Sequence, residues 1–128
     1  MKVLVVDDNP ANLKLACDIL ACEGFEVMRA ANAEEVLATI GDSQPEVILM
    51  DIGIPGMDGL TLTRKLKSNE PTKHIRIVAL TAFAMKGDDQ KAREAGCDGY
   101  LTKPINTRTL SMQIMQILQG DPVSENAQ

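Results

Sequence analysis

The sequence predicts an α/β domain of the (βα)5 type, in which five short strands form a doubly wound parallel sheet. Five short apolar runs alternate with five segments of helical periodicity, and no internal repeat divides the chain. The 128 residues, 45% of them hydrophobic, are sufficient for one core. Strands that alternate with helices form right-handed βαβ units, which place helices on both faces of a parallel sheet.

The first half of the chain contains three strand signals and two helix signals. Strands are expected over residues 2–6 and 47–51, which are mainly apolar and too short for helices, and over the short segment 26–30. Asn9 before Pro10 predicts one helix start, and Asn32 predicts another. Gly24 and Gly41 are expected to end these two helices. The apolar side of the second helix is expected to comprise Val36, Leu37 and Ile40.

The second half of the chain continues the alternation. Strands are expected over residues 75–80 and 99–102, with a helix between residues 60 and 69 before the first of them. A short helix opens at residues 87–89 and is stopped by Gly96, and Asn106 is expected to cap the last helix. The apolar stripe of that last helix comprises Leu110, Ile114, Ile117 and Leu118. We expect one domain over residues 1–119 and a flexible tail over residues 120–128.

The charge and composition exclude several classes of protein. A net charge of −5 argues against binding to a nucleic-acid backbone, and no apolar run approaches the roughly 20 residues of a membrane span. The N-terminus lacks the pattern of a secretory signal. Cys17, Cys22 and Cys97 form no C-x-x-C pair, which favours structural thiols over disulfides or metal ligands. We therefore expect a cytoplasmic domain that contacts neither nucleic acid nor membrane.

Polar side chains stand at the carboxyl ends of four predicted strands. They are Asp7 and Asp8 after the first, Asp51 at the end of the third, Thr81 after the fourth and Lys103 after the fifth. In an open parallel sheet these ends meet at one edge, where reactive groups gather. Converging carboxylates repel one another unless a cation intervenes, and a hard ion such as Mg²⁺ prefers oxygen ligands. A carboxylate beside a divalent ion, a lysine and a hydroxyl is equipped to attack phosphorus.

These residues and their surroundings resemble the receiver domain of two-component response regulators, from about residue 2 to residue 118. The matching motifs are Asp7-Asp8, LMD at 49–51, PGMDG at 55–59, LTA at 80–82 and Lys103-Pro104. The segment TAFAMKGD at 81–88 is similar to that of stand-alone, DivK-like single-domain regulators. The resemblance implies a flavodoxin-like strand order of 2-1-3-4-5.

The resemblance also implies roles at the predicted site. Asp51 would be the phosphoacceptor and, with Asp8, a direct ligand of Mg²⁺. Asp7 would bind the ion through water, and the Gly53 carbonyl would be a further ligand. Lys103 would contact the phosphoryl group.

A second set of implied roles concerns the response to phosphorylation. Thr81 would contact the phosphoryl group, and its hydroxyl would move inward when that group arrives. Tyr100 would then pack into the vacated space, so that the pair acts as the switch. Pro104 would follow a cis peptide bond, a minority form even before proline, that aims Lys103 at Asp51.

The same resemblance implies partners on the domain surface. The phosphoryl donor would be a histidine kinase or a histidine phosphotransfer protein, docking at the first helix and the corner at Pro104-Ile105. Output would be made by the receiver surface toward a downstream protein target, and we expect no enzymatic turnover. Met112 and Met115 lie about opposite the apolar stripe of the last helix, either as an adaptable binding surface or as the edge of the core.

Three other functions compete with this interpretation. A haloacid-dehalogenase-type phosphatase also uses a strand-end aspartate with Mg²⁺, but it would need a second aspartate where this chain has Gly53. A flavodoxin-like FMN-binding protein would need a phosphate-binding loop after the first strand, where Asp7 and Asp8 would repel phosphate. A purely structural pseudo-receiver would be expected to lack one of the site residues, and none is missing.

Overall fold

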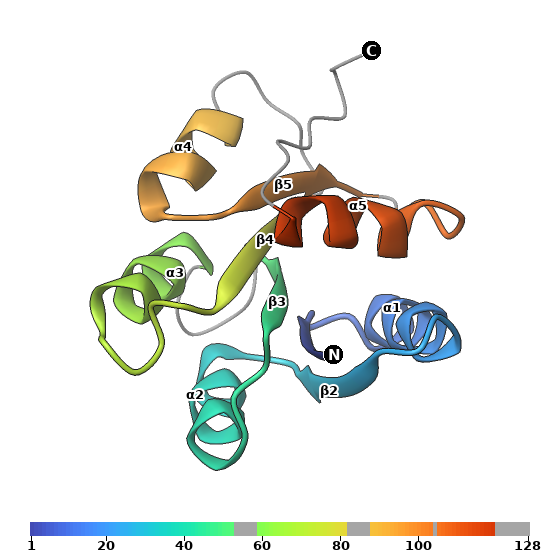
Figure 1. The fold of residues 1–128 in the computed structure, drawn as a ribbon, viewed down its shortest axis with the longest axis horizontal. Helices are drawn as coiled ribbons and strands as arrows, with labels where there is room; N and C mark the ends of the chain where they lie inside the picture. The colour runs from blue at the N-terminus through green and yellow to red at the C-terminus, as the bar shows by residue number, and fades with distance from the viewer. Residues whose placement is uncertain (53–58, 82–87, 104, 120–128) are drawn as a thin grey trace.

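The computed structural model describes residues 1–52, 59–81, 88–103 and 105–119, with the side chains of residues 88 and 89 left aside. These residues form one sheet with the strand order β2-β1-β3-β4-β5, and every pairing is parallel, which confirms the predicted fold class (Figure 1). The strands are β1 (Lys2–Val6), β2 (Glu26–Ala30), β3 (Val47–Asp51), β4 (Arg76–Thr81) and β5 (Gly99–Thr102). The helices are α1 (Pro10–Cys22), α2 (Ala33–Asp42), α3 (Gly59–Ser68), α4 (Asp88–Ala95) and α5 (Leu110–Leu118).

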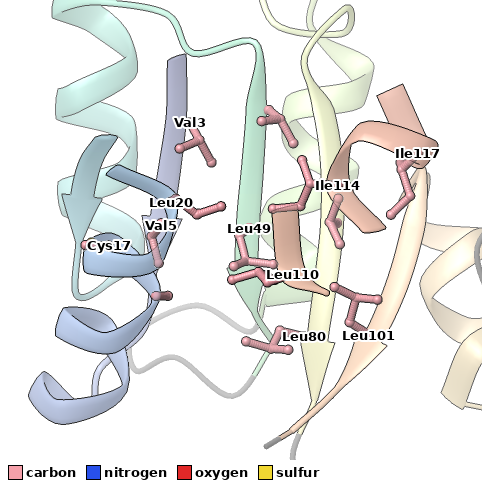
Figure 2. Close-up of a cluster of buried hydrophobic side chains, with 13 residues drawn as sticks. Val3, Val5, Cys17, Leu20, Leu49, Leu80, Leu101, Leu110, Ile114 and Ile117 are labelled. Carbon is pink, nitrogen blue, oxygen red and sulfur yellow. The ribbon is translucent and has the colours of Figure 1, made fainter. Parts of the chain in front are cut away.

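Helices cover both faces of the sheet, and each face has its own apolar cluster. On one face, α1 and α5 pack over alternate residues of four strands, a cluster shown in Figure 2 that includes Val5, Leu49, Leu80 and Leu101. On the other face, α2 and α3 pack over the intervening residues, among them Met50. Because both faces are covered, β3 is buried along its whole length, which explains its uninterrupted apolar sequence.

Two of the three predicted asparagine caps are confirmed. The Asn9 side chain accepts hydrogen bonds from the backbone N–H groups of Ala11 and Asn12, at 2.9 and 3.1 Å, and Pro10 is the first residue of α1. The Asn32 side chain accepts from the N–H of Glu35 at 2.9 Å. These bonds satisfy N–H groups that have no partner within the helix.

The predicted end of α2 and its apolar side need correction. Gly41 does not end the helix; it lies inside α2, which continues to Asp42 and is followed by Ser43. Only Gly24 and Gly96 among the described residues have positive φ, so Gly41 adopts an ordinary helical conformation. Leu37 is exposed, because the buried side of α2 is centred on Val36 and Ile40.

The start of α5 was also predicted incorrectly. The Asn106 side chain accepts a hydrogen bond from the N–H of Arg108, and residues 107–109 form a turn. The helix therefore begins at Leu110, after Thr109, whose side chain makes no capping bond. Asparagine stabilises such a turn by the same kind of bond that it uses as a helix cap, so the residue type alone does not separate the two.

The predicted ends of α1, α4 and β4 can be compared with the structure. Gly24 and Gly96 end α1 and α4 as predicted, with φ of +93° and +105°, a region that favours glycine. Thr81 is the last residue of β4 rather than the residue after it. Among the described residues, no helix is long and apolar enough to span a bilayer.

Candidate functional site

The strand register places the predicted site residues at one edge of the sheet. Val6 of β1 lies beside Met50 of β3, so Asp7 and Asp51 follow at the same level of adjacent strands. Asp51 in turn lies beside Leu80, one residue before Thr81. The polar side chains expected at separate strand ends are thus brought together by pairing alone.

Asp7 is held in a fixed position by its backbone and its side chain. Its N–H donates to the carbonyl of Ala30 at 3.1 Å, and its Oδ1 accepts from the N–H of Asn9 at 2.9 Å. Only 2% of the residue is exposed. Burial raises the pKa of this carboxyl above its ordinary value of 3.8, although the hydrogen bond from Asn9 and the charge of Lys103 oppose the shift.

Lys103 joins the two buried carboxylates. Its Nζ lies 3.0 Å from Oδ2 of Asp51 and 3.2 Å from Oδ2 of Asp7. Its backbone N–H donates to the carbonyl of Thr81 at 2.7 Å, which fixes the start of the side chain at the edge of β4. Burial by itself would lower the pKa of Lys103, but the hydrogen bond and charge of Asp51, followed by those of Asp7, raise it above 10.5.

The three aspartates form a group that fits a hard divalent cation. One carboxylate oxygen from each of Asp7, Asp8 and Asp51 lies within 4.8 Å of the others. Asp7 and Asp51 are buried, whereas Asp8 is exposed to solvent. Three carboxylates against one ammonium leave an excess of negative charge, and oxygen ligands on a partly open site suit Mg²⁺, which keeps several waters when it binds.

A glycine permits the close approach of α3 to this edge. The N–H of Gly59 donates to the carbonyl of Ile52 at 3.1 Å. A Cβ at this position would lie 2.6 Å from Cα of Ile52 and 3.0 Å from the carbonyl oxygen of Asp51. Any other residue would therefore displace the first turn of α3 from the end of β3.

The predicted switch residues lie on one face of the sheet. Tyr100 of β5 lies beside Ala79 of β4. Thr81 follows Ala79 by two residues on β4 and lies beside Thr102 of β5. Leu80 and Leu101 point toward α1 and α5, so the side chains that alternate with them point to the opposite face. Tyr100 is half-buried, as a residue that changes its packing would need to be.

Two predicted positions lie outside the described residues. These are Gly53, with its carbonyl ligand, and Pro104, with the expected cis bond. Asn12 and Leu15, which were not among the predicted site residues, line a cavity of about 310 Å³ together with Lys103 and Ile105. The spacing of Leu15 against the buried Ala16 and Leu20 was the available signal, because it places this leucine on the outer side of α1.

Comparison with known proteins identifies the family. The model of the response regulator receiver domain matches residues 3–115. The chain belongs to this family. Two curated relatives, the polar-differentiation response regulators DivK of Brucella anthropi and Brucella ovis, are each 42% identical to this receiver domain over 104 residues. The matched region is 81% of this chain and 85% of each relative.

Solved structures agree with the receiver fold. A response regulator from Chloroflexus aurantiacus is 33% identical, with a TM-score of 0.87, and the match covers 92% of this chain and 97% of that one. The chemotaxis response regulator CheY4 of Vibrio cholerae is 29% identical, with a TM-score of 0.85 and coverage of 91% and 97%. The receiver domain is therefore that of a DivK-like two-component response regulator.

Proposed function

We propose that this receiver domain accepts one phosphoryl group on Asp51 in a cytoplasmic phosphorelay. The observation that supports the proposal is the buried carboxylate of Asp51 at the end of β3, 3.0 Å from the ammonium of Lys103 and grouped with Asp7 and Asp8. A buried carboxylate with a fixed cationic neighbour is positioned to attack the phosphorus atom of a donor, and the cation can then stabilise the resulting acyl phosphate.

Each residue of the site has a part in the transfer. An oxygen of Asp51 forms the new bond to phosphorus while the bond from phosphorus to the donor histidine nitrogen breaks, and the electron pair stays on that nitrogen. Lys103 offsets the charge on the transferred group. Asp7, Asp8 and Asp51 would hold Mg²⁺, with the Gly53 carbonyl, and the bound ion would neutralise charge on the phosphoryl oxygens. Because one phosphoryl group remains on the protein, Asp51 is a stoichiometric acceptor and turnover is not its role.

The cavity beside Lys103 supports a docking site for the phosphoryl donor. Leu15 is 43% exposed on α1, and with Ile105 it forms an apolar rim around the cavity. An exposed apolar rim next to a polar reaction site suits a protein partner that must exclude water during transfer. The donor in this proposal is a histidine kinase or a histidine phosphotransfer protein.

The outer side of α5 supports a surface for the downstream target. Met112 and Met115 are 54% and 37% exposed, so they form surface and not the edge of the core. Residues 109–119 contain no charged side chain, in contrast to the outer sides of α1 and α2. Methionine is enriched and charge depleted at protein interfaces, so this side of α5 suits a protein target. In this proposal Thr81 and Tyr100 respond to phosphorylation from the other face of the sheet.

Phosphorylation by a small-molecule donor tests the proposal. The protein is incubated with Mg²⁺ and acetyl phosphate, and the intact mass is measured. We expect one added phosphoryl group in the wild type and none in Asp51→Asn, with Asp42→Asn on α2 as a control that still gains the group. The proposal would be contradicted by a wild type that stays unmodified or by an Asp51→Asn variant that gains the group. It would also be contradicted if acetyl phosphate were hydrolysed faster than the phosphorylated protein loses its phosphoryl group.

A further inference from the structure

One side of α3 connects the phosphoacceptor end of β3 with the turn before β5. Gly59, Thr63 and Lys67 are spaced four residues apart, so they line one side of the helix; we call them the bridge face. Gly59 contacts the end of β3, and Thr63 and Lys67 both contact the turn at residues 96–98. The bridge face is distinct from the Leu62 and Leu66 side chains that pack into the core.

The upper contact of the bridge face is with the site. Gly59 lies against the backbone of Asp51 and Ile52 so closely that no side chain fits between them. Its N–H also donates to the carbonyl of Ile52. A displacement of this backbone would therefore be transmitted to the first turn of α3, because packed segments in direct contact move together.

The central contact is a buried polar one. Thr63 has no exposed surface, and its hydroxyl donates to the carbonyl of Gly59 at 2.8 Å. The Sγ of Cys97 lies 3.9 Å from the same hydroxyl, as a donor to it. Burial raises the pKa of the Cys97 thiol to about 11, so the thiol keeps its proton at neutral pH. Thr63 is thus the residue that touches both the first turn of α3 and the turn before β5.

The lower contact holds the same turn by an ion pair. Nζ of Lys67 lies 2.8 Å from Oδ2 of Asp98 and 2.7 Å from the carbonyl oxygen of Ile75. The same oxygen of Asp98 accepts a hydrogen bond from the N–H of Ile77 at 2.9 Å. A Cβ on Gly96 would lie 3.0 Å from the Lys67 side chain. Residues 96–98 therefore contact α3 through Lys67 and the start of β4 through Ile77.

We propose that the bridge face couples the phosphorylation state of the site to the turn at residues 96–98, with Thr63 as its central positioning residue. This inference rests on the proposed function. The turn joins α4 directly to β5, and Tyr100 is the second residue of β5. A shift of α3 would therefore move the beginning of the strand that carries Tyr100. This route is separate from the contact of Lys103 with Thr81 at the other end of the strand.

Alkylation of Cys97 provides a direct test. In a Cys22→Ser variant, which removes the exposed thiol, the reaction of Cys97 with iodoacetamide is followed by peptide mass in Mg²⁺ with and without acetyl phosphate. We expect phosphorylation to change the Cys97 rate by at least about fivefold, the lower end of ordinary allosteric coupling. The rate at Cys17, buried under the opposite face of the sheet, should stay the same.

Substitution of Thr63 tests the position of the coupling. In the Cys22→Ser background, Thr63→Val should abolish the difference between the two states, and Thr63→Ser, which keeps the hydroxyl, should retain it. Lys67→Met should reduce the difference and serves as a second variant if Thr63→Val does not fold. Parallel intact masses report whether Asp51 is modified in each variant.

The outcomes separate the two proposals. A fully phosphorylated parent protein with an unchanged Cys97 rate would overturn the coupling and leave the phosphoacceptor function standing. The coupling would also be overturned if Thr63→Val kept the full difference in Cys97 alkylation rate between the two phosphorylation states. If Thr63→Val is unfolded, the same result in Lys67→Met would overturn it. A parent protein that gains no phosphoryl group would overturn the phosphoacceptor function and the coupling with it.

Discussion

The ammonium of Lys103 lies 3.0 Å from a carboxylate oxygen of Asp51, although the two residues are 52 positions apart. A second aspartate, Asp7, lies 3.2 Å from the same nitrogen. Lys103 is therefore the cation that balances the buried carboxylates of the described site. Three consequences of this arrangement can be measured, and a fourth prediction concerns two glycines.

Removal of the Lys103 ammonium should destabilise the metal-free protein. Lys103→Met leaves two buried carboxylates without their cation, and we expect the free energy of unfolding to fall by about 1–3 kcal/mol. Urea unfolding in EDTA measures this loss, and Lys103→Arg, which keeps the charge, should lose less. A Lys103→Met variant as stable as the wild type in EDTA would show that the lysine is not a significant counter-ion.

The aspartate group should make stability depend on Mg²⁺. Binding to the folded state alone raises the free energy of unfolding by about 2.7 kcal/mol at an ion concentration one hundred times the dissociation constant. Asp8→Asn should remove most of this gain and should stabilise the metal-free protein slightly, because one of three mutually repelling carboxylates is neutralised. Thermal unfolding with and without Mg²⁺ measures both effects. The exposed control Asp42→Asn should respond to the ion like the wild type.

The raised pKa of Asp7 gives a signed pH dependence in the absence of metal. Above its ordinary value of 3.8, the folded protein still holds a proton on Asp7 that the unfolded chain has released. The free energy of unfolding contributed by this group therefore falls as the pH rises from 3.8 through the raised pKa. We expect the stability of the wild type relative to Asp7→Asn to decline over this range, measured by urea unfolding in EDTA from about pH 4 to about pH 7. A relative stability that rises with pH would contradict the raised pKa.

Two glycine substitutions should have opposite effects. Gly59→Ala places a Cβ 2.6 Å from backbone that cannot rotate away, so we expect a loss of about 1–3 kcal/mol and slower phosphorylation. Gly41→Ala meets no atom within 4 Å inside α2 and should gain roughly 0.5–1 kcal/mol, because alanine restricts the unfolded chain. Chemical unfolding of both variants, with phosphorylation followed by intact mass, provides the comparison. Equal stability of the two variants would mean that the approach of α3 to β3 tolerates a side chain.

The sequence alone determined the strands, their alternation with helices and the residues that stand at the strand ends. These features depend on local periodicity, on apolar runs and on caps such as Asn9, all of which act over a few residues. Asp7, Asp51 and Lys103 could be named in advance because parallel pairing brings strand ends to one edge. The resemblance to receiver domains supplied the order of the strands and the roles expected of these residues.

Only the tertiary structure decided which of several local possibilities applied. Asn106 stabilises a turn and not a helix start, and Gly41 continues a helix that it could have ended. Only the packing of distant segments reveals that Gly59 must lack a side chain, and that Thr63 of α3 contacts Cys97 in the turn before β5. The reason is physical: local signals fix the conformation of a segment, whereas contacts between segments depend on how the whole core is filled.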